Sequence, residues 1–336
     1  MLRAWRRFCI FNFNMLRRLS ACAASLLVYA ILFGTILDRP LSFGFLQQQI
    51  EAKLIRGAAL TSPKLVILAG SNGPYSHRCE TLEPLVRLPC VNGGVAVGIG
   101  LDYLLARWLP LLRPGDMVYL PMEEEQYVRG RPTMALGPDA AIMFRHDRRT
   151  LVQLSPSRWI AAMFSFDLRS GVMSVLEAAL ALSHFRDPRM QIGGSTNAWG
   201  DHFGHTRSLA AANRLVLAKF HPHPTDPSHV RTGYGAALIA GFTREATKRG
   251  ITVIGGLPAG FADIPVSDDA LAAIRNVYQA NGGGFIALPN RSRYPRECFF
   301  DSPEHLNEEC QITHSVALAG ALNRKLGEPR STLASR

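Results

Sequence analysis

The sequence predicts an α/β fold: a three-layer α/β/α domain on a parallel five-stranded sheet, preceded by one transmembrane helix. Three observations support this prediction. Short apolar runs that stop at turn residues recur along the chain, segments with helical spacing separate them, and one long apolar run follows a basic N-terminus. Continuous apolar runs are typical of strands buried on both faces, and their alternation with helices indicates a parallel sheet between two helical layers.

The N-terminus has the pattern of a membrane anchor. Residues 1–18 contain five arginines and no acidic residue, and residues 19–37 carry no charge. At about 1.5 Å per residue that run is roughly 28 Å long, enough to span a hydrocarbon core. We therefore expect a cytoplasmic tail at 1–18, an anchor at 19–37 and the rest of the chain beyond the membrane. A cleaved signal peptide is the alternative, but the run is long for one and residues 34–38 are a poor cleavage site.

The remaining segments define a linker and one domain. Residues 38–62 predict a linker with a short helix near 46–56, and residues 63–328 predict the domain. The strands are expected at 64–69, 88–91, 117–120, 251–255 and 284–288, and the helices at 99–112, 232–249, 268–279 and 306–326. Residues 130–230 interrupt this alternation and are rich in arginine, histidine and proline. We expect an insertion there, over the carboxyl edge of the sheet, where ligands bind in such folds.

Charge and cysteine content narrow the class of protein. The net charge of +11 suggests nucleic acid, but the tail holds five of these charges and no basic run follows, so we expect no nucleic-acid binding. Beyond the anchor lie four cysteines, and we expect the local disulfides Cys79–Cys90 and Cys298–Cys310; four buried thiols are the alternative. No C-x-x-C spacing is present, so we expect no metal site.

Ser71 is the candidate nucleophile. The sequence Gly70-Ser71-Asn72 comes directly after the first expected strand. A serine at that point projects into the crevice at the strand ends, and the N–H groups of the turn can meet a developing oxyanion. An ordinary turn is the alternative for this motif alone.

Asp301 and His305 are the candidate partners of that serine. A serine nucleophile needs a base within hydrogen-bond reach and a carboxylate that orients the base. The stretch Asp301-Ser302-Pro303-Glu304-His305 precedes the last expected helix, so one short loop carries both groups. A plain helix N-cap with a surface histidine is the alternative. A third motif, residues 91–101, has four glycines; it lacks the features of a phosphate loop, and a glycine N–H in it suits a second oxyanion donor.

Together these motifs resemble the SGNH/GDSL hydrolase superfamily, and more closely its membrane-anchored branch associated with bacterial exopolysaccharide modification. The resemblance rests on Gly70-Ser71-Asn72, on Asn92 with the glycines that follow it, on Gly115-Asp116, and on the block from Asp301 through Pro303 and His305 to Leu306 and Asn307. It covers residues 63 to about 325 and is weakest at 130–230. It implies a flavodoxin-like domain in the periplasm, held by a single-pass anchor in the bacterial inner membrane.

The resemblance also implies roles for single residues. Ser71 becomes the nucleophile, His305 the acid–base residue, Asp301 its carboxylate and Gly94 an oxyanion donor. One departure stands out: the superfamily's third block supplies an oxyanion asparagine, whereas here the strand ends in Pro121-Met122-Glu123. Asn72 or Asn92 is then expected to substitute, or the hole has two donors. One lost donor costs roughly 2.7–4 kcal/mol of transition-state stabilisation, so a slow or inactive protein is a real alternative.

Further candidates rank lower. Glu123, with the two glutamates after it, lies at a strand end and is expected to bind a sugar or a cation, or else to be a solvated edge. Asn197 and Asp201 resemble a motif of the same branch and are expected to line the cleft. His221, His223 and His229 have no metal-ligand spacing and fit a loop surface. No G-x-S-x-G motif occurs, which excludes an α/β-hydrolase elbow.

The expected function is that of a serine esterase or O-acyltransferase, with acetyl as the expected group, acting on an extracytoplasmic polysaccharide. The triad chemistry needs no cofactor, and proteins of exopolysaccharide synthesis are the expected partners. A catalytically weak or inactive accessory subunit that binds glycan in the same cleft is the alternative, since the third-block asparagine is missing.

Overall fold

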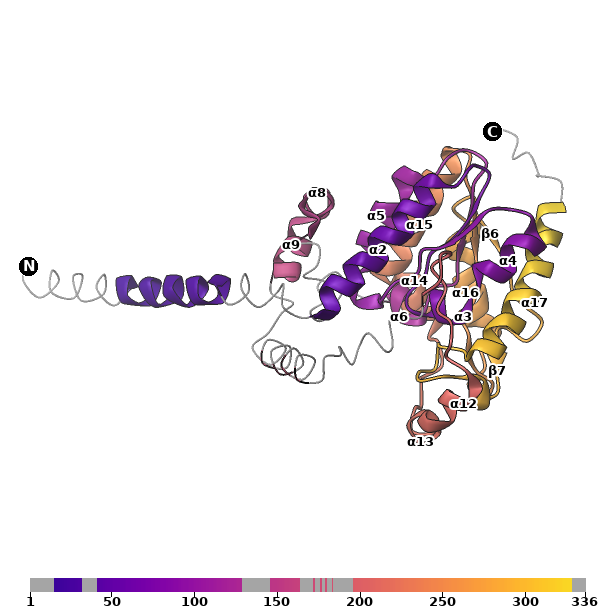
Figure 1. Cartoon of the computed structure of the whole chain (residues 1–336). Helices are drawn as coiled ribbons and strands as arrows, with labels where there is room; N and C mark the ends of the chain where they lie inside the picture. The colour runs from indigo at the N-terminus through magenta and orange to yellow at the C-terminus, as the bar shows by residue number, and fades with distance from the viewer. Residues whose placement is uncertain are drawn as a thin grey trace, which may run out of the picture.

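A parallel five-stranded sheet organises the molecule (Figure 1). The computed structural model describes residues 15–31, 41–128, 146–163 and 196–327, with four isolated positions at 172, 176, 179 and 183. The strands are β1 (Leu65–Ile67), β2 (Cys90–Asn92), β3 (Met117–Leu120), β4 (Thr252–Gly255) and β6 (Gly284–Phe285). Their order is β2-β1-β3-β4-β6, and each neighbouring pair is parallel. All five predicted strands are confirmed, and their order is that of a doubly wound sheet of the flavodoxin type.

The alternation of side chains along β1 shows why helices cover both faces. Val66 and Leu68 belong to a core cluster with α5 (Leu101–Trp108), α15 (Tyr234–Lys248) and α16 (Asp268–Gln279). Leu65 and Ile67 belong to a second cluster with α4 (Cys79–Val86) and α17 (Glu308–Gly327). Successive side chains of a strand point to opposite faces, so a continuous apolar run needs two apolar layers. The three predicted layers are therefore present, and α15 and α17 lie on opposite sides in Figure 1.

Shorter elements complete the described chain. The helices are α3 (Asn72–Ser76), α6 (Glu124–Val128), α8 (Arg148–Leu151), α9 (Pro156–Met163), α12 (Arg207–Ala210), α13 (Arg214–Leu217) and α14 (Pro227–Thr232). The 3-10 turns are η1 (Val97–Ile99), η2 (Leu109–Leu111), η5 (Ala211–Asn213) and η6 (Arg296–Cys298), and β5 (Gly260–Phe261) pairs with β7 (Arg293–Tyr294). A buried ion pair joins Lys64 Nζ to Asp116 Oδ2 over 2.9 Å, at the starts of β1 and β3.

The segment that we predicted as a linker forms part of the domain. Residues Leu41–Ala59 form the helix α2, longer than the short helix expected at 46–56. Ile50 and Leu54 on α2 are each only 5% exposed and belong to the main core cluster. The sequence pattern missed this because the apolar residues of the helix do not gather on one face, and its packing against the core decides its burial.

The membrane anchor stays a prediction. Within the part of the chain that the structure describes, no helix is long and apolar enough to cross a membrane. Residues 15–31 are helical. Residues 32–37, the end of the expected span, lie outside the described residues, as do 1–14.

The predicted insertion is described in two parts, and residues 129–145 and most of 164–195 lie outside them. The first part, with α8 and α9, is attached to α5 through Arg158, whose Nε lies 2.9 Å from Asp102 Oδ2. The second part runs from residue 196 and reaches the carboxyl edge of the sheet, where His202 N donates to Pro74 O over 3.0 Å. This second part thus lies where we expected the insertion to cover the sheet.

Both predicted disulfides are present. Cys79 is bonded to Cys90 and Cys298 to Cys310. Structural disulfides form in oxidising compartments, so they indicate an extracytoplasmic location for the domain.

Candidate active site

Ser71 lies where the chain leaves β1 and starts α3, at the carboxyl edge of the sheet. The neighbours of β1 are β2 on one side and β3 on the other, which makes this the point where the strand order reverses and where ligands bind in such sheets. The turn requires glycine at position 70, because a Cβ there would lie 2.5 Å from both Glu123 Oε1 and Val97 Cγ2. The local sequence thus lets the serine turn pack directly against the loop after β3.

Ser71, His305 and Asp301 form a hydrogen-bonded chain. His305 Nε2 lies 2.8 Å from Ser71 Oγ, and His305 Nδ1 lies 2.6 Å from Asp301 Oδ1. With the proton on Nδ1, the imidazole donates to Asp301 and accepts from the serine hydroxyl. The side chain of His305 is 13% exposed and that of Asp301 is 37% exposed, so solvent reaches the group. The structure brings together three residues that the sequence spreads over 234 positions.

The loop that carries Asp301 and His305 is fixed at several points. Ser76 Oγ on α3 donates to Glu304 O over 2.6 Å and accepts from Leu306 N over 3.2 Å. Phe300 N donates to His305 O over 2.8 Å. The disulfide Cys298–Cys310 joins a residue before this loop to a residue after it. The helix that Ser71 starts therefore also positions the loop that brings the histidine.

An aromatic group lies against the histidine. The rings of Tyr75 and His305 are stacked, with centroids 4.1 Å apart and an angle of 10° between their planes. The ring of Tyr75 also lies against the imidazoles of His202 and His205, with ring centroids 4.2 Å and 5.3 Å from its own. Our sequence reasoning missed all three residues. The signal for Tyr75 was its place four residues after Ser71, which puts both side chains on one face of a helix.

The electrostatics favour an ionised Asp301 beside neutral histidines. Burial alone would raise the pKa of Asp301, but the hydrogen bond from His305 and the nearby imidazoles lower it below the usual value. Burial lowers the pKa of His202 to about 3 and that of His205 to about 4. Both nitrogens of the His205 ring are buried without a hydrogen-bond partner. A charged His205 would thus face a large desolvation cost.

The predicted substitute donors for the oxyanion, Asn72 and Asn92, make buried hydrogen bonds within the fold. Asn72 is fully buried and its Nδ2 donates to Pro121 O over 2.7 Å. Asn92 is fully buried as well, and its Nδ2 has acceptors in Gly73 O, His77 O and Asp201 Oδ1. Their role as oxyanion donors stays a prediction. The N–H of Gly94 donates to Asn92 Oδ1 over 3.3 Å, a long bond that a substrate oxygen would have to replace.

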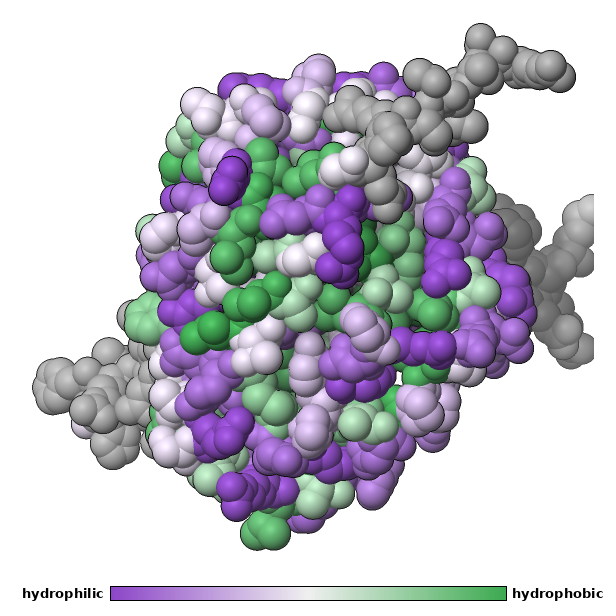
Figure 2. All heavy atoms as spheres, turned by 90° about the vertical axis from the view of Figure 1, so that its right-hand side faces the viewer, coloured by the Kyte–Doolittle hydropathy of each residue, from purple (hydrophilic) through white to green (hydrophobic). Residues whose placement is uncertain are grey.

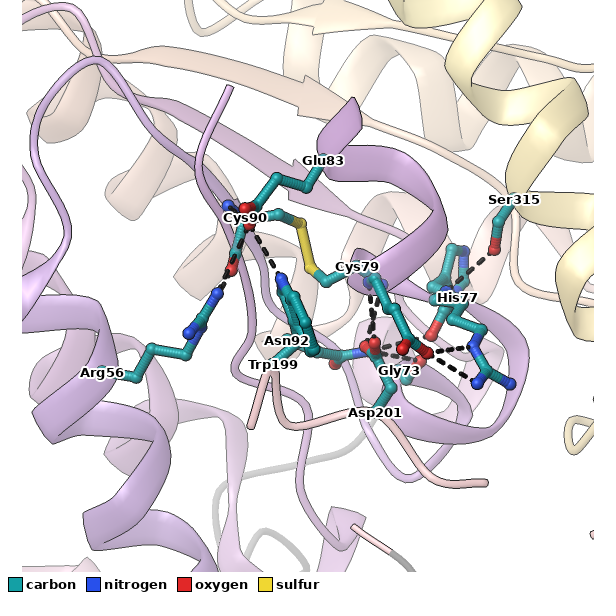
Figure 3. The surroundings of a disulfide bond; sticks show 12 residues. Arg56, Gly73, His77, Cys79, Glu83, Cys90, Asn92, Trp199, Asp201 and Ser315 are labelled. Atoms are coloured by element: carbon teal, nitrogen blue, oxygen red, sulfur yellow. Dashed lines mark hydrogen bonds and ion pairs between the residues drawn. A yellow bond between two sulfur atoms is a disulfide. The ribbon is translucent and has the colours of Figure 1, made fainter. Parts of the chain in front are cut away.

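Asp201 points at the start of α4, beside Cys79 (Figure 3), and Asn197 supports it. Asp201 accepts from Cys79 N over 2.9 Å and from Glu80 N over 3.0 Å, at the start of α4. Asn197 Oδ1 accepts from Asp201 N over 3.0 Å and so fixes the turn. Carboxylates at a helix N-terminus satisfy free N–H groups and the helix dipole. We had expected both residues to bind substrate, and the structure instead gives them a role in packing.

Two charged residues flank the serine turn. Glu123 Oε1 accepts from Asn72 N over 3.4 Å, so a carboxylate lies against the backbone of the serine turn. Lys53 on α2 was missed, because its segment was taken for a linker; its Nζ donates to Gly94 O. Burial lowers the pKa of Lys53 to about 8, against the opposing charge of Asp201.

A cavity lies next to the loop that carries Asp301 and His305, which we call the triad loop. It extends from the ends of β3 and β4 to that loop, and its wall includes Glu123, Pro303 and Glu304, with Phe261 and Arg293 opposite. The Nε of Arg293 is buried without a hydrogen-bond partner. Burial raises the pKa of Glu304. The cavity thus offers an apolar wall, a guanidinium and carboxyl groups next to the loop that carries Asp301 and His305.

The histidines without metal-ligand spacing lie at the surface. His221, His223 and His229 are exposed. Among the described residues, no group of three or more histidine, cysteine or acidic side chains could hold a metal ion.

Comparison of the chain with protein-family models, with curated proteins and with solved structures finds no match.

Proposed function

We propose that this chain is a serine esterase or O-acyltransferase of the SGNH type. One observation supports this most strongly, namely the chain of hydrogen bonds from Ser71 Oγ through His305 to Asp301, with distances of 2.8 and 2.6 Å. These distances are within the range at which a base takes a proton from a nucleophile. The fold, with the serine after β1 and the acid–base loop before the last helix, is consistent with the resemblance in the sequence.

The reaction follows from these positions. Ser71 Oγ attacks the carbonyl carbon of an ester while His305 Nε2 takes the hydroxyl proton, and Asp301 stabilises the imidazolium that forms. The carbonyl electron pair moves to oxygen, towards the N–H groups of the serine turn and Gly94. The intermediate then expels the alcohol, which receives the proton from His305. Water, or a sugar hydroxyl deprotonated by His305, attacks the acyl-serine and releases the enzyme.

The substrate and the location are part of the same proposal. From the resemblance, we infer that the acyl group is acetyl and that it is carried by a polysaccharide outside the cytoplasm. The disulfides support an extracytoplasmic domain. A single N-terminal span at 19–37 in the bacterial inner membrane would place the triad in the periplasm, near proteins of exopolysaccharide synthesis.

The test is acetyl release from a chromogenic acetate ester by the full chain in detergent, together with labelling by a fluorophosphonate probe. We expect both reactions in the wild-type protein and neither in Ser71→Ala. Ser76→Ala is not a suitable control because Ser76 fixes the triad loop, so Ser208→Ala, an exposed serine on α12, serves instead. Equal activity in Ser71→Ala and wild type would refute the proposal.

A second candidate is an accessory subunit that binds glycan without catalysis. It is favoured by the oxyanion side of the site, where Asn72 and Asn92 are committed to buried contacts and Glu123 adds a carboxylate. Normal polymer acetylation in cells that produce only Ser71→Ala would support this candidate. Loss of acetylation in those cells would exclude it.

A further inference from the structure

Residues 203–220 form a folded surface segment with apolar side chains in water. The segment contains α12, η5 and α13. Leu209 is 58% exposed, Leu215 80% and Val216 51%, and Phe203 and Phe220 are exposed as well. Such a group of large apolar side chains within one short helical stretch marks an interaction site more often than chance exposure.

The opposite side of the segment is packed. Ala210 and Leu217 are only 4% and 3% exposed. Leu217 belongs to a core cluster with Phe299 and Leu306, on either side of the triad loop. The exposed residues are therefore not the result of an unfolded loop. They are the outer face of a segment whose inner face is fixed.

The charged side chains of the segment are all basic. Residues 202–225 contain no acidic residue. Arg207, Arg214 and Lys219 are exposed beside the apolar side chains. The nearby carboxylates of Glu308 and Glu309 accept from the backbone amides of Gly204 and Arg207. Apolar side chains flanked by cations are the composition of segments that lie in the interface of an anionic membrane.

The segment is also attached to the candidate active site. Asn213 Nδ2 donates to Phe300 O over 2.9 Å, directly before Asp301. Arg296 Nη1 donates to Leu217 O over 2.7 Å. In Figure 1, α12 and α13 lie at the bottom, next to the start of α17 and opposite its C-terminal end. Figure 2 shows a mostly purple and pale surface at that lower end, with a green group at the very bottom.

We propose that residues 203–220 dock on an anionic bilayer surface. The apolar side chains enter the headgroup region, and Arg207, Arg214 and Lys219 meet lipid phosphates. This contact adds to the predicted anchor, because it fixes the orientation of the domain. It rests on the proposed function in one respect only: the docked domain presents the triad to substrate at the membrane surface, such as a glycan or acyl donor carried by a lipid.

The test uses the full chain in lipid nanodiscs. Cys9→Ser and Cys22→Ser leave only the four disulfide-bonded cysteines, and Ala212→Cys then carries an environment-sensitive fluorophore on η5. Ala237→Cys on α15 is the matched control, since both alanines are exposed and the second lies on another face of the domain. In nanodiscs with phosphatidylglycerol we expect the emission at position 212 to rise about twofold or more, and spin-labelled lipid to quench it. The control should show neither effect.

Two variants identify the cause of the signal. Leu215→Ser with Val216→Ser should abolish the rise at position 212, and Arg214→Gln with Lys219→Gln should reduce it in anionic but not in zwitterionic nanodiscs. Equal signals at 212 and 237 would overturn the proposal. The apolar segment would then be a surface for binding a glycan or a protein instead. If the chain does not insert through its N-terminus, vesicles of the same lipids are added to it and the same readings decide. Hydrolysis of a soluble ester, measured in parallel, tests the proposed function separately.

Discussion

The two halves of the candidate site differ in how far they follow the chemistry of a serine hydrolase. The half that would activate the nucleophile has all its hydrogen bonds, with 2.8 Å between His305 Nε2 and Ser71 Oγ and 2.6 Å between His305 Nδ1 and Asp301 Oδ1. The half that would stabilise the oxyanion follows that chemistry less far. The side-chain amides of Asn72 and Asn92 are buried and occupied, and Glu123 lies beside the serine turn.

This difference separates nucleophile activation from transition-state stabilisation. The first needs one serine, one imidazole and one carboxylate, which two loops deliver. The second needs donors aimed at the position of the developing charge, and each missing donor slows catalysis by about 10²–10³. A site of this kind should label with a reactive probe and yet turn over slowly. The following predictions test each half.

The largest effect is expected from Asp301→Asn. This change keeps the shape of the side chain but removes the charge that orients the imidazole, and kcat should fall about 10⁴-fold. The measurement is hydrolysis of a chromogenic acetate ester. Asp268→Asn on α16, far along the chain from the triad loop, is the control and should keep its activity. A loss of less than tenfold in Asp301→Asn would mean that the carboxylate has no part in the reaction.

Tyr75→Leu should lower kcat about 10- to 100-fold with little change in KM. The stacked ring keeps the imidazole of His305 in place and stabilises its charged form during the reaction. Tyr75→Phe keeps the ring and should retain most of the activity, which separates stacking from any role of the hydroxyl. Thermal unfolding of both variants checks that the fold persists. Equal losses in the two variants would contradict a role for stacking.

Acid should destabilise the fold through its buried histidines. The pKa of His202 is lowered to about 3 and that of His205 to about 4, from 6.5. As the pH falls below 6.5, these two imidazoles bind protons in the unfolded chain but not yet in the folded one. The free energy of unfolding is therefore highest above pH 6.5 and decreases as the pH falls towards 4. Each group contributes up to about 1.4 kcal/mol per pH unit. We measure the free energy of unfolding by urea at several pH values from 7 to 5. This free energy should change less with pH in His205→Phe than in the wild type, and an equal pH dependence in both would disprove this account.

The smallest effect is expected on the oxyanion side. Glu123→Gln removes a negative charge next to the serine turn and supplies a neutral donor, so kcat/KM should rise a few-fold. Glu124→Gln is the matched control, because Glu124 bonds Thr225 instead, with 2.9 Å between Oε2 and Oγ1. A fall in Glu123→Gln, with no change in Glu124→Gln, would show that the carboxylate is needed as an acceptor.

The sequence determined the sheet, both disulfides and the members of the triad. Apolar runs such as 117–120 specify strands buried on both faces wherever they occur, since the pattern reflects local burial. Ser71, Asp301 and His305 were identifiable because Gly70-Ser71-Asn72 directly follows an apolar run and one short loop carries both the carboxylate and the imidazole.

The tertiary structure alone decided the surroundings of those residues. Asn92 and Asp201 look like ligands in the sequence, yet Asn92 donates to Gly73 O and His77 O around α3, and Asp201 accepts from the start of α4, more than 100 positions before it. Tyr75 and Lys53 carry no motif, and their place beside His305 and Gly94 results from packing. A motif records what a residue can do chemically, whereas the hydrogen bonds available to it depend on which other segments the fold brings within 3 Å.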